Sequence, residues 1–533
     1  MRTLSHRCPE SDAFLVVDGR VAALGHEIGT LRADRVIDAG GATILPGFVD
    51  AHTHLELTAL ALYTAVDCRP PAVTSIAEVQ RRLREAAQRV PPGTWVKGQG
   101  TLFQDRQMAE GRYPNRHDLD LVSRHHPVVF RSSFHVAILN TKGLEVAGVD
   151  RHTPDPPGGL VERDADGEPT GLTKDMYHLL GVPEPSQAER RAAIERCVRE
   201  NFLASGVTSL GEIGHSREGL ETMRELSLAL RVGVYVHVPA VAGFDEALEG
   251  LPETLPGGNP RFQGIKLFLD GGTTAMAAAF HDPYELDPST NGRLAYDVDE
   301  LTQMLGRATD AGVQLAMHAV GDRAQDTVIA AARRLPAERV RAARHRVEHA
   351  GNILCTFERR AQLRDAGLLP VPNPGFIYSF GDALETYLGA ERTRSAYPFR
   401  SLIEEGAALA AGGDCSGTDA RLCQPLFGIA CAVTRRTLSG KRLDPGESIA
   451  VEQAIRMYTT WAAYAARAES DLGSIEAGKC ADFVVLSEDP FTASPQSIAE
   501  ISVQETWIDG RLVFSRAGGA SSIPQAISRE VGV

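Results

Sequence analysis

Apolar runs of strand length alternate with amphipathic helical segments through most of the chain, from about residue 48 to residue 468. Residues 206–210, 234–238 and 264–269 are such apolar runs, and residues 186–204 have the spacing of a helix. This alternation is typical of a parallel sheet whose strands are connected by helices. In a chain of 533 residues it predicts an α/β fold built on a closed (β/α)₈ TIM barrel.

Both ends of the chain are rich in short strand-like runs, whereas the middle is not. Residues 14–17 precede an Asp-Gly turn signal near the N-terminus, and residues 481–486 and 503–513 have the same character near the C-terminus. The economical arrangement pairs both ends in one small β-sandwich beside the barrel. The predicted divisions are residues 1–47 (sandwich, N-terminal part), 48–468 (barrel) and 469–533 (sandwich, C-terminal part).

The alternation is interrupted near its beginning. Between His54 and Gly206 lie far more residues than one βα unit needs, and the stretch contains several Pro- and Gly-rich turns. We therefore expect a large insertion after the first barrel strand, at about residues 60–190. Loops at the carboxyl ends of barrel strands build the active site, so this insertion is expected to cover the pocket.

Charge and cysteine content indicate which kinds of binding partner and which cellular compartment to expect. The net charge is −14, which argues against nucleic acid or an anionic membrane as the main partner and leaves a small molecule. Eight cysteines form no CxxC pair, and no apolar stretch is long enough to span a bilayer. The first 19 residues lack an apolar signal core. We expect a cytoplasmic protein; the oligomeric state stays open, a homo-oligomer included.

Two histidines separated by one residue, His52 and His54, follow the apolar run 44–49. On a strand, side chains two residues apart point to the same face, so both imidazoles could hold one divalent metal ion. The alternative is a polar strand end with two solvated histidines. The buried character of the strand, Asp50 two residues before His52, and further histidines downstream favour the metal site.

Residues 46–54, Pro-Gly-Phe-Val-Asp-Ala-His-Thr-His, resemble the first-strand motif of the amidohydrolase superfamily. Later motifs resemble amidohydrolase family 3, which includes YtcJ-like proteins and N-substituted formamide deformylases. The similarity extends from about residue 44 to residue 510. It implies a metal-dependent hydrolase barrel with a small β-domain assembled from both termini.

Lys266 lies inside an apolar run, where a lysine is costly unless its amine reaches solvent or is modified. Together with Asp270 and Gly271 it matches the family pattern Lys-x-x-x-Asp-Gly on the fourth strand. The resemblance implies that Lys266 is N6-carboxylated by CO₂ and bridges two metals. A lysine that extends to the barrel mouth is the alternative.

His318 and His349 each close an apolar run at a turn, which is where a barrel presents metal ligands. Asp414 follows a small apolar run and two glycines, and it resembles the last-strand aspartate of the superfamily. A turn aspartate is the alternative. Strand alternation places Glu348 on the face opposite His349, and His345 lies too far back for the same metal. We therefore expect each of them either to support a metal ligand or to support the structure.

The predicted metal ligands are His52, His54, Lys266, His318, His349 and Asp414. Nitrogen and oxygen ligands without a thiolate suit one or two Zn²⁺ ions, and Mn²⁺, Co²⁺ or Fe²⁺ are compatible. A metal-bound hydroxide would attack a carbonyl carbon, and Asp414, as the catalytic residue, would pass the proton to the leaving nitrogen.

The predicted function is hydrolysis of a non-peptide C–N bond in an amide or formamide-type substrate. Ring opening of a cyclic amide or deamination on the same metals is one alternative. A non-catalytic regulator or binding protein on a retained barrel is a second, although such a protein need not keep Asp414.

Two further residues are predicted to contact the substrate. Residues 131–135 resemble a family segment that faces the substrate, and His135 is the candidate there, with Ser133-Phe134 where the family usually has Asp-Gly. Met276 stands where an arginine tends to fall in the family's segment after the Asp-Gly pair. The loss of that charge predicts a neutral or apolar acyl or amine portion. Alternatively, the segment around Met276 only packs against the insertion.

Overall fold

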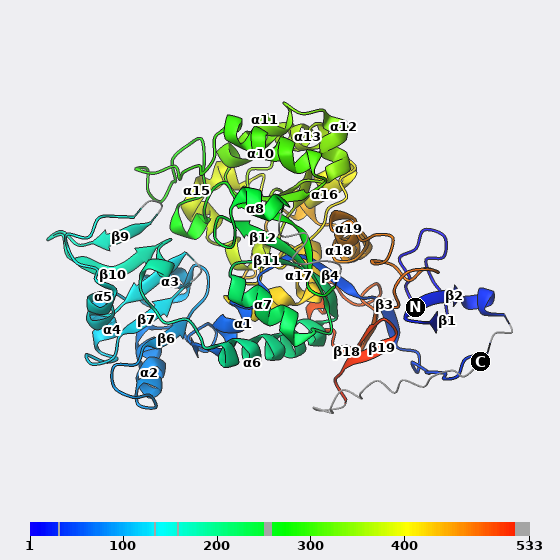
Figure 1. Ribbon diagram of the computed structural model, residues 1–533, viewed down its shortest axis with the longest axis horizontal. Coiled ribbons are helices and arrows are strands. Elements are labelled where there is room, and N and C mark those ends of the chain that lie inside the picture. The colour runs from blue at the N-terminus through cyan, green and yellow to red at the C-terminus, as the bar shows by residue number, and fades with distance from the viewer. Residues whose placement is uncertain (30–31, 133–134, 157–158, 250–257, 518–533) are drawn as a thin grey trace.

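The computed structural model describes residues 1–29, 32–132, 135–156, 159–249 and 258–517, and Ser133 and Phe134 lie outside these ranges. Its centre is a parallel sheet of seven strands in the order β16-β15-β14-β13-β12-β11-β4 (Figure 1). In chain order these strands are β4 (Phe48–Thr53), β11 (Val207–Gly214), β12 (Arg231–Val238), β13 (Arg261–Phe268), β14 (Gln314–His318), β15 (Arg346–Glu348) and β16 (Leu369–Val371).

Residues 409–414 occupy the position between the two edge strands of this sheet. The backbone N–H of Gly412 donates to the carbonyl of Pro372, directly after β16 (3.1 Å). On the other side, the N–H of Ala51 in β4 donates to the carbonyl of Ala411 (3.0 Å), and the N–H of Asp414 donates to the carbonyl of His52 (2.8 Å). These bonds nearly close the sheet into a TIM-type barrel, as the sequence predicts.

Helix α10 (Val298–Asp310), in the barrel region, begins at a residue whose side chain caps it. Asp297 caps its first turn by accepting a hydrogen bond from the backbone N–H of Glu300 (2.8 Å). Leu301 and Leu305, four residues apart, are fully buried on one face. The other helices of this region are α1 (Leu55–Tyr63), α6 (Gln187–Cys197), α7 (Arg217–Leu226), α8 (Phe244–Glu249), α11 (Asp322–Ala332), α12 (Ala337–Ala343), α13 (Phe357–Asp365), α14 (Phe376–Phe380), α15 (Leu384–Thr393), α16 (Phe399–Glu404), α17 (Pro425–Thr434), α18 (Val451–Met457) and α19 (Thr460–Ala465).

A second, mixed sheet of six strands lies in the chain between β4 and β11, and at the left of Figure 1. Its order is β5-β6-β7-β8-β10-β9, and it has an apolar core of its own that includes Leu83, Phe130 and Ile138. The predicted insertion limits of about 60–190 stay a prediction. The elements are β5 (Val66–Asp67), α2 (Ile76–Ala87), β6 (Val96–Gln99), α3 (Gln104–Gln107), α4 (Arg116–Asp120), β7 (Val128–Arg131), β8 (Val136–Leu139), α5 (Thr141–Ala147), β9 (Leu160–Arg163) and β10 (Pro169–Lys174).

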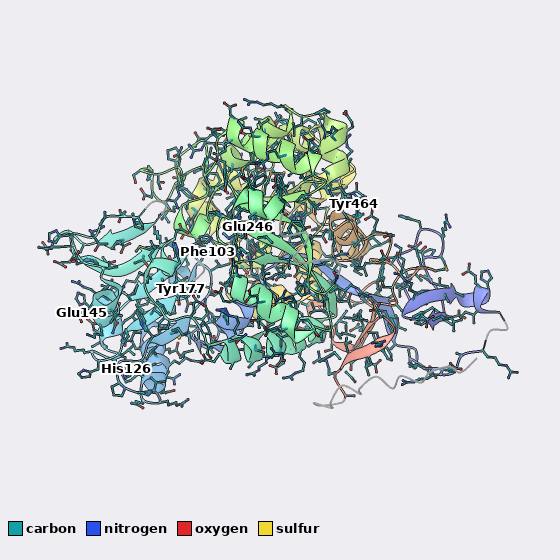
Figure 2. All side chains as sticks on the ribbon, in the orientation of Figure 1. Phe103, His126, Glu145, Tyr177, Glu246 and Tyr464 are labelled. Atoms are coloured by element: carbon teal, nitrogen blue, oxygen red, sulfur yellow. The ribbon has the colours of Figure 1, made fainter. Side chains whose placement is uncertain are left out.

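Phe103 joins the region of this second sheet to the barrel. Its ring packs edge-on against Phe380 of α14 and Tyr387 of α15, with ring centroids 4.9 and 5.0 Å apart, and Phe103 is labelled in Figure 2. The contact is buried. The second sheet is therefore anchored to helices that border the carboxyl ends of the barrel strands.

The two ends of the chain share a four-stranded sheet of order β19-β18-β17-β3. Its strands are β3 (Thr43–Pro46), β17 (Phe483–Leu486), β18 (Val503–Ile508) and β19 (Arg511–Ser515), and β1 (Phe14–Val17) and β2 (Arg20–Leu24) form a separate antiparallel pair. Phe14 packs edge-on against Phe483, which stacks on Trp507. The description of these two sheets as a sandwich, and the limits 1–47 and 469–533, stay predictions.

In the described part of the chain, no helix combines the length and the apolar character needed to cross a membrane.

Candidate metal centre

The predicted ligands meet at the carboxyl ends of the barrel strands. His52 is the last residue but one of β4, His318 is the last residue of β14, and His349 directly follows β15. Lys266 lies within β13, and Asp414 ends the segment that closes the barrel. His54 precedes α1. Parallel strands bring these positions, which are far apart in the chain, to one end of the barrel.

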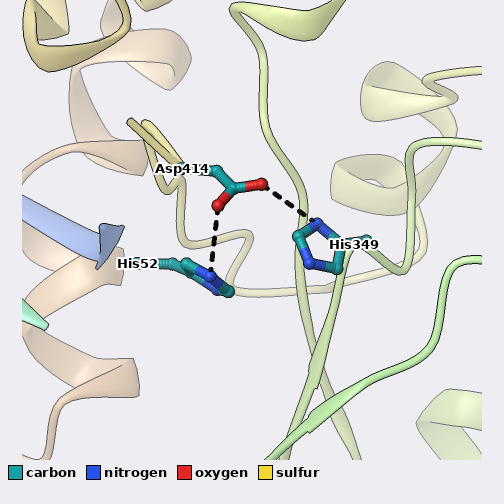
Figure 3. A group of neighbouring side chains, drawn as sticks. All are labelled: His52, His349 and Asp414. Carbon is teal, nitrogen blue, oxygen red and sulfur yellow. Dashed lines mark ion pairs between the residues drawn. The ribbon is translucent and has the colours of Figure 1, made fainter. Parts of the chain in front are cut away.

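Three of these residues form a compact group. One ligand atom from each of His52, His349 and Asp414 lies within 4.8 Å of the others. Figure 3 shows the Asp414 carboxylate reaching toward both rings: Oδ1 is 3.5 Å from Nε2 of His52, and Oδ2 is 3.9 Å from Nδ1 of His349. Two imidazoles and a carboxylate at such distances are a donor set that suits a divalent transition metal.

His54 extends this group on the side of the second barrel strand. Its Nε2 lies 2.8 Å from Oδ1 of Asp414, and its Nδ1 lies 2.8 Å from Nε2 of His215. Burial opposes ionisation of Asp414, but the hydrogen bond with His54 and the charges of the neighbouring histidines outweigh burial and hold the pKa of the carboxyl below its usual value. Asp414 is therefore an anion at neutral pH.

Lys266 is fully buried, and its Nζ has no hydrogen-bond partner among the described residues. Burial lowers the pKa of the amine to about 8, although the carboxylates of Glu348 and Asp414 oppose this shift. A pKa near 8 leaves part of the amine neutral at physiological pH, and the neutral amine is the form that reacts with CO₂.

His318 lies beside His349, with ring centroids 4.5 Å apart. Its Nε2 is 3.5 Å from Oδ1 of Asp270. Burial, reinforced by the positive charge that His349 and Lys266 would carry, places the pKa of His318 well below its usual value. The ring is neutral, as a metal-ligating imidazole must be.

Two buried nitrogen atoms show that the group fits a metal. Nε2 of His52 and Nζ of Lys266 have no hydrogen-bond partner within the described ranges. A buried polar atom without a partner is unfavourable by roughly 1–3 kcal/mol. A divalent cation with a carboxylated Lys266 would satisfy both atoms, so the residues present fit the group that the sequence predicts.

Glu348 corrects one expectation from the sequence. The sequence predicts that Glu348 points away from His349, but both side chains lie next to His52. Oε2 of Glu348 accepts a hydrogen bond from Nδ1 of His52, and the ring centroids of His52 and His349 are 5.1 Å apart. Strand alternation fails here because β15 ends at Glu348, and His349 adopts a left-handed φ of +72°. Arg346 donates from Nε to Oε1 of Glu348 (2.7 Å), and both side chains are fully buried.

His345, by contrast, supports the structure as expected. Its Nδ1 accepts a hydrogen bond from the backbone N–H of Leu315 (3.0 Å), and its Nε2 lies 2.9 Å from the hydroxyl of Thr309. These contacts are at the beginning of β14, whereas the candidate ligand His318 is at its end.

Asp50 fastens the first strand to the closing segment. Its Oδ1 accepts hydrogen bonds from the backbone N–H groups of His52 (3.1 Å) and Gly413 (2.9 Å). Burial raises the pKa of this carboxyl to about 7, although both bonds oppose the shift. Asp414 also has a left-handed backbone, with φ +48°. Asp50 therefore fixes the backbone on both sides of the group that includes His52 and Asp414.

A cavity opens above these ligands, and its walls are largely apolar. Among the described residues that line it, none is a lysine or an arginine, and Asp414 is the one carboxylate. The lining residues are His52, His54, Leu57, Leu102, His135, His215, Phe268, Gly272, Thr273, Thr274, His318, Val320, His349, Asn352, Ile353, Phe376, Phe380, Tyr397, Asp414 and Ser416.

The two predicted substrate contacts differ in their placement. His135 lines the cavity, and its Nδ1 lies 2.5 Å from Oδ1 of Asp175. Met276 is half-buried and is not among the lining residues, whereas Thr273 and Thr274 of the same segment are. The role of each residue in substrate binding stays a prediction.

Sequence reasoning missed His215 and Asn373. His215 directly follows β11 and contacts His54; a histidine at a strand end is the same signal that identified His318. Asn373 follows β16, and its Oδ1 accepts a hydrogen bond from Nδ1 of His349 (2.8 Å), which leaves Nε2 of that ring as the metal-binding nitrogen. An asparagine after a strand has no distinctive pattern in the sequence.

Known proteins resemble this chain over nearly its whole length. A model of the amidohydrolase family matches residues 35–514. The N-substituted formamide deformylase of Arthrobacter pascens is 30% identical over 97% of both chains, and the putative amidohydrolase YtcJ of Bacillus subtilis is 30% identical over 97% of this chain and 98% of that protein.

Solved structures agree with this family and with the barrel. An uncharacterized metal-dependent hydrolase from Pyrococcus horikoshii has a TM-score of 0.69 at 26% identity and covers 90% of this chain and 94% of its own. A second one, from Pyrococcus furiosus, has a TM-score of 0.67 at 27% identity and covers 90% and 95%. The resemblance seen in the sequence is thereby confirmed, and the chain belongs to the amidohydrolase family of metal-dependent hydrolases.

Proposed function

We propose that this protein hydrolyses the C–N bond of a neutral, non-peptide amide, such as an N-substituted formamide, with one or two divalent metal ions. The proposed metal ligands are His52, His54, Lys266, His318, His349 and Asp414, with Lys266 N6-carboxylated and Zn²⁺ as the first candidate metal. The observation that carries this proposal is the convergence of these side chains, two of them with buried unpartnered nitrogens, beneath an apolar cavity.

The bound metal would polarise the substrate carbonyl and lower the pKa of water. The protein's own residues prepare the site for this. Glu348 accepts from Nδ1 of His52 and Asn373 accepts from Nδ1 of His349, so each ring presents Nε2. Asp414, ionised at neutral pH, would take the proton from the attacking water as the carbon–oxygen bond forms.

The cavity supports a neutral substrate with an apolar substituent. Phe268, Ile353, Phe376 and Phe380 contribute apolar walls, and no lysine or arginine among the described lining residues could pair with a carboxylate. A peptide with charged ends would bury a carboxylate among these apolar side chains, which is unfavourable. The name of the Arthrobacter pascens relative, an N-substituted formamide deformylase, agrees with this substrate class.

We also propose that residues 1–47 and 469–533 form one β-domain beside the barrel, and that residues 60–190 are an insertion over the cavity. The pairing of β3 with β17 supports the first assignment. The six-stranded sheet between β4 and β11, with His135 reaching the cavity, supports the second.

The test combines metal analysis with a panel of amides. Metal-loaded protein is expected to release benzylamine from N-benzylformamide, to lose that activity when a chelator removes the metal, and to leave an unblocked dipeptide intact. Release of ammonia from adenine, or ring opening of hydantoin, in place of formamide hydrolysis would instead identify a deaminase or a cyclic amidohydrolase. Stoichiometric metal without turnover of any of these compounds would contradict the proposal.

A further inference from the structure

One wall of the cavity comes from the second sheet and ends in a His–Asp pair. β8 and β10 are antiparallel, with Val136 opposite Lys174, so His135 and Asp175 are the next pair in register. The backbone N–H of Asp175 donates to the carbonyl of His135 (2.9 Å), and Nδ1 of His135 lies 2.5 Å from Oδ1 of Asp175. Two contacts between the same residues fix the orientation of the imidazole.

The opposite edge of the His135 ring faces the barrel. A Cβ atom at Gly272 would lie 2.7 Å from Cδ2 and 2.9 Å from Nε2 of His135, so glycine at this position lets the ring approach. Gly272 and His135 both line the cavity, as do His318 and Asp414. Nδ1 is bonded to Asp175, and Nε2 is a ring nitrogen on the side of Gly272.

His135 is also the titratable group that remains when the other lining residues are assigned. Five titratable lining residues are proposed metal ligands, and His215 contacts one of them, His54. Burial raises the pKa of Tyr397 far above neutrality, so its phenol is a poor acid.

The carboxylate of Asp175 favours the protonated form of His135. Asp175 lies on the second sheet, and Asp270, Asp414 and His318 lie on the barrel side. Burial alone would lower the pKa of His135, but the hydrogen bond and charge of Asp175, helped by Asp414 and Asp270, outweigh it, and the pKa is raised.

We propose that His135, held by Asp175, is the acid that protonates the leaving nitrogen, and that Asp175 is its positioning residue. This rests on the proposed amide hydrolysis. When the C–N bond breaks, its electron pair stays on nitrogen, and the proton on Nε2 of His135 transfers to that nitrogen. The sequence predicts that Asp414 itself delivers this proton. In this scheme Asp414 instead releases to solvent the proton that it took from water, and His135 regains one from solvent, which restores both groups. The sum is one amide and one water converted to one acid and one amine.

The test uses two formamides with leaving groups of different basicity. N-benzylformamide releases a basic amine that must be protonated as it leaves, whereas 4-nitroformanilide releases a weakly basic one. His135→Gln should lower kcat for N-benzylformamide by roughly a hundredfold, the scale of general acid catalysis, and kcat for 4-nitroformanilide by less than about fivefold, with little change in KM. Asp175→Asn should give the same pattern with a smaller loss.

The matched control is His281→Gln. His281 also bonds an aspartate, with Nε2 2.9 Å from Oδ2 of Asp326, but its side chain is 55% exposed and is not among the residues that line the cavity. This variant should leave both rates unchanged. An equal loss on both formamides in His135→Gln, with full metal content, would overturn the proposal in favour of simple substrate positioning.

A second measurement does not depend on turnover. In protein labelled with ¹⁵N-histidine, the His135 ring should titrate above the ordinary histidine range, and Asp175→Asn should lower that pKa. A His135 signal whose pKa does not fall in metal-free Asp175→Asn protein would overturn the assignment. Inactivity of the wild type on both formamides, with the His135 titration as expected, would count against the proposed substrate class and not against the His–Asp pair.

Discussion

The cavity has two walls of different construction. The barrel wall presents His52, whose ring is held by Glu348 and, through it, by Arg346, all fully buried. The wall from the second sheet presents His135, held by Asp175, and each of these side chains is 18% exposed. The buried wall suits ligands that must not move, whereas the more accessible wall suits a group that exchanges protons with solvent.

The substitution with the largest expected effect on the barrel wall removes two of its histidines. His52→Ala combined with His54→Ala should remove most of the bound metal and abolish turnover, because both rings belong to the proposed ligand set. Metal content by mass spectrometry and hydrolysis of N-benzylformamide measure the two losses. A double variant that keeps full metal and activity would place the centre elsewhere.

Asp414→Asn should be the next most severe change. It retains the size of the side chain and one oxygen ligand but removes the carboxylate base, so kcat should fall by roughly a hundredfold or more while KM moves less. At least one metal should stay bound. Near-normal turnover by a metal-loaded variant would show that another group takes the proton from water.

Glu348→Gln tests the buried support of the barrel wall. A neutral amide accepts from His52 more weakly than the carboxylate, so metal affinity should fall by about 10–100-fold, as is typical when the partner of a ligating histidine is lost. Competition with a chromogenic chelator measures it. Glu385→Gln, an exposed change with its own ion pair to Lys441, serves as the control. An unchanged affinity would mean that His52 needs no such support.

Lys266 should form its carbamate in a pH-dependent manner. Its pKa is lowered to about 8, so the amine is neutral above that pH and protonated below it. The neutral fraction should rise about tenfold between pH 7 and pH 9. In metal-free protein with ¹³C-bicarbonate, the carbamate NMR signal should therefore grow over this range and be absent in Lys266→Ala. A signal that falls as pH rises would contradict the lowered pKa.

Gly272→Ala is expected to have the smallest effect, and it addresses the contact between the two walls. The new Cβ would meet the ring of His135, so kcat should fall a few-fold while metal content stays full. Gly243→Ala is the matched control, because a Cβ there meets nothing within 4 Å. Equal behaviour of the two variants would show that the ring of His135 can shift without consequence.

The two walls also differ in how far the sequence predicts them. The barrel ligands are readable because each closes an apolar strand, and parallel strands bring their ends together whatever the loops do. The expected orientation of Glu348 was wrong, because strand alternation stops at His349, whose left-handed backbone depends on the tertiary structure. Its expected role, to support a ligand or the structure, agrees with its hydrogen bond to His52.

The second sheet is harder to predict. Its strand order, β5-β6-β7-β8-β10-β9, mixes parallel and antiparallel pairs, so sequence spacing does not indicate that Asp175 lies beside His135. Sequence spacing also does not indicate that Thr273 and Thr274 line the cavity while Met276, in the same segment, does not.

The left-handed backbone of His349 and Asp414 has a consequence for engineering. Each such conformation in a residue other than glycine is unfavourable by roughly 1–3 kcal/mol and persists because the surrounding barrel imposes it. Glycine at either position would relieve the strain and raise thermal stability, while it deletes a ligand. A search for heat-resistant variants that ignores catalysis would therefore tend to select against these two side chains, so stability and activity are in direct competition at this centre.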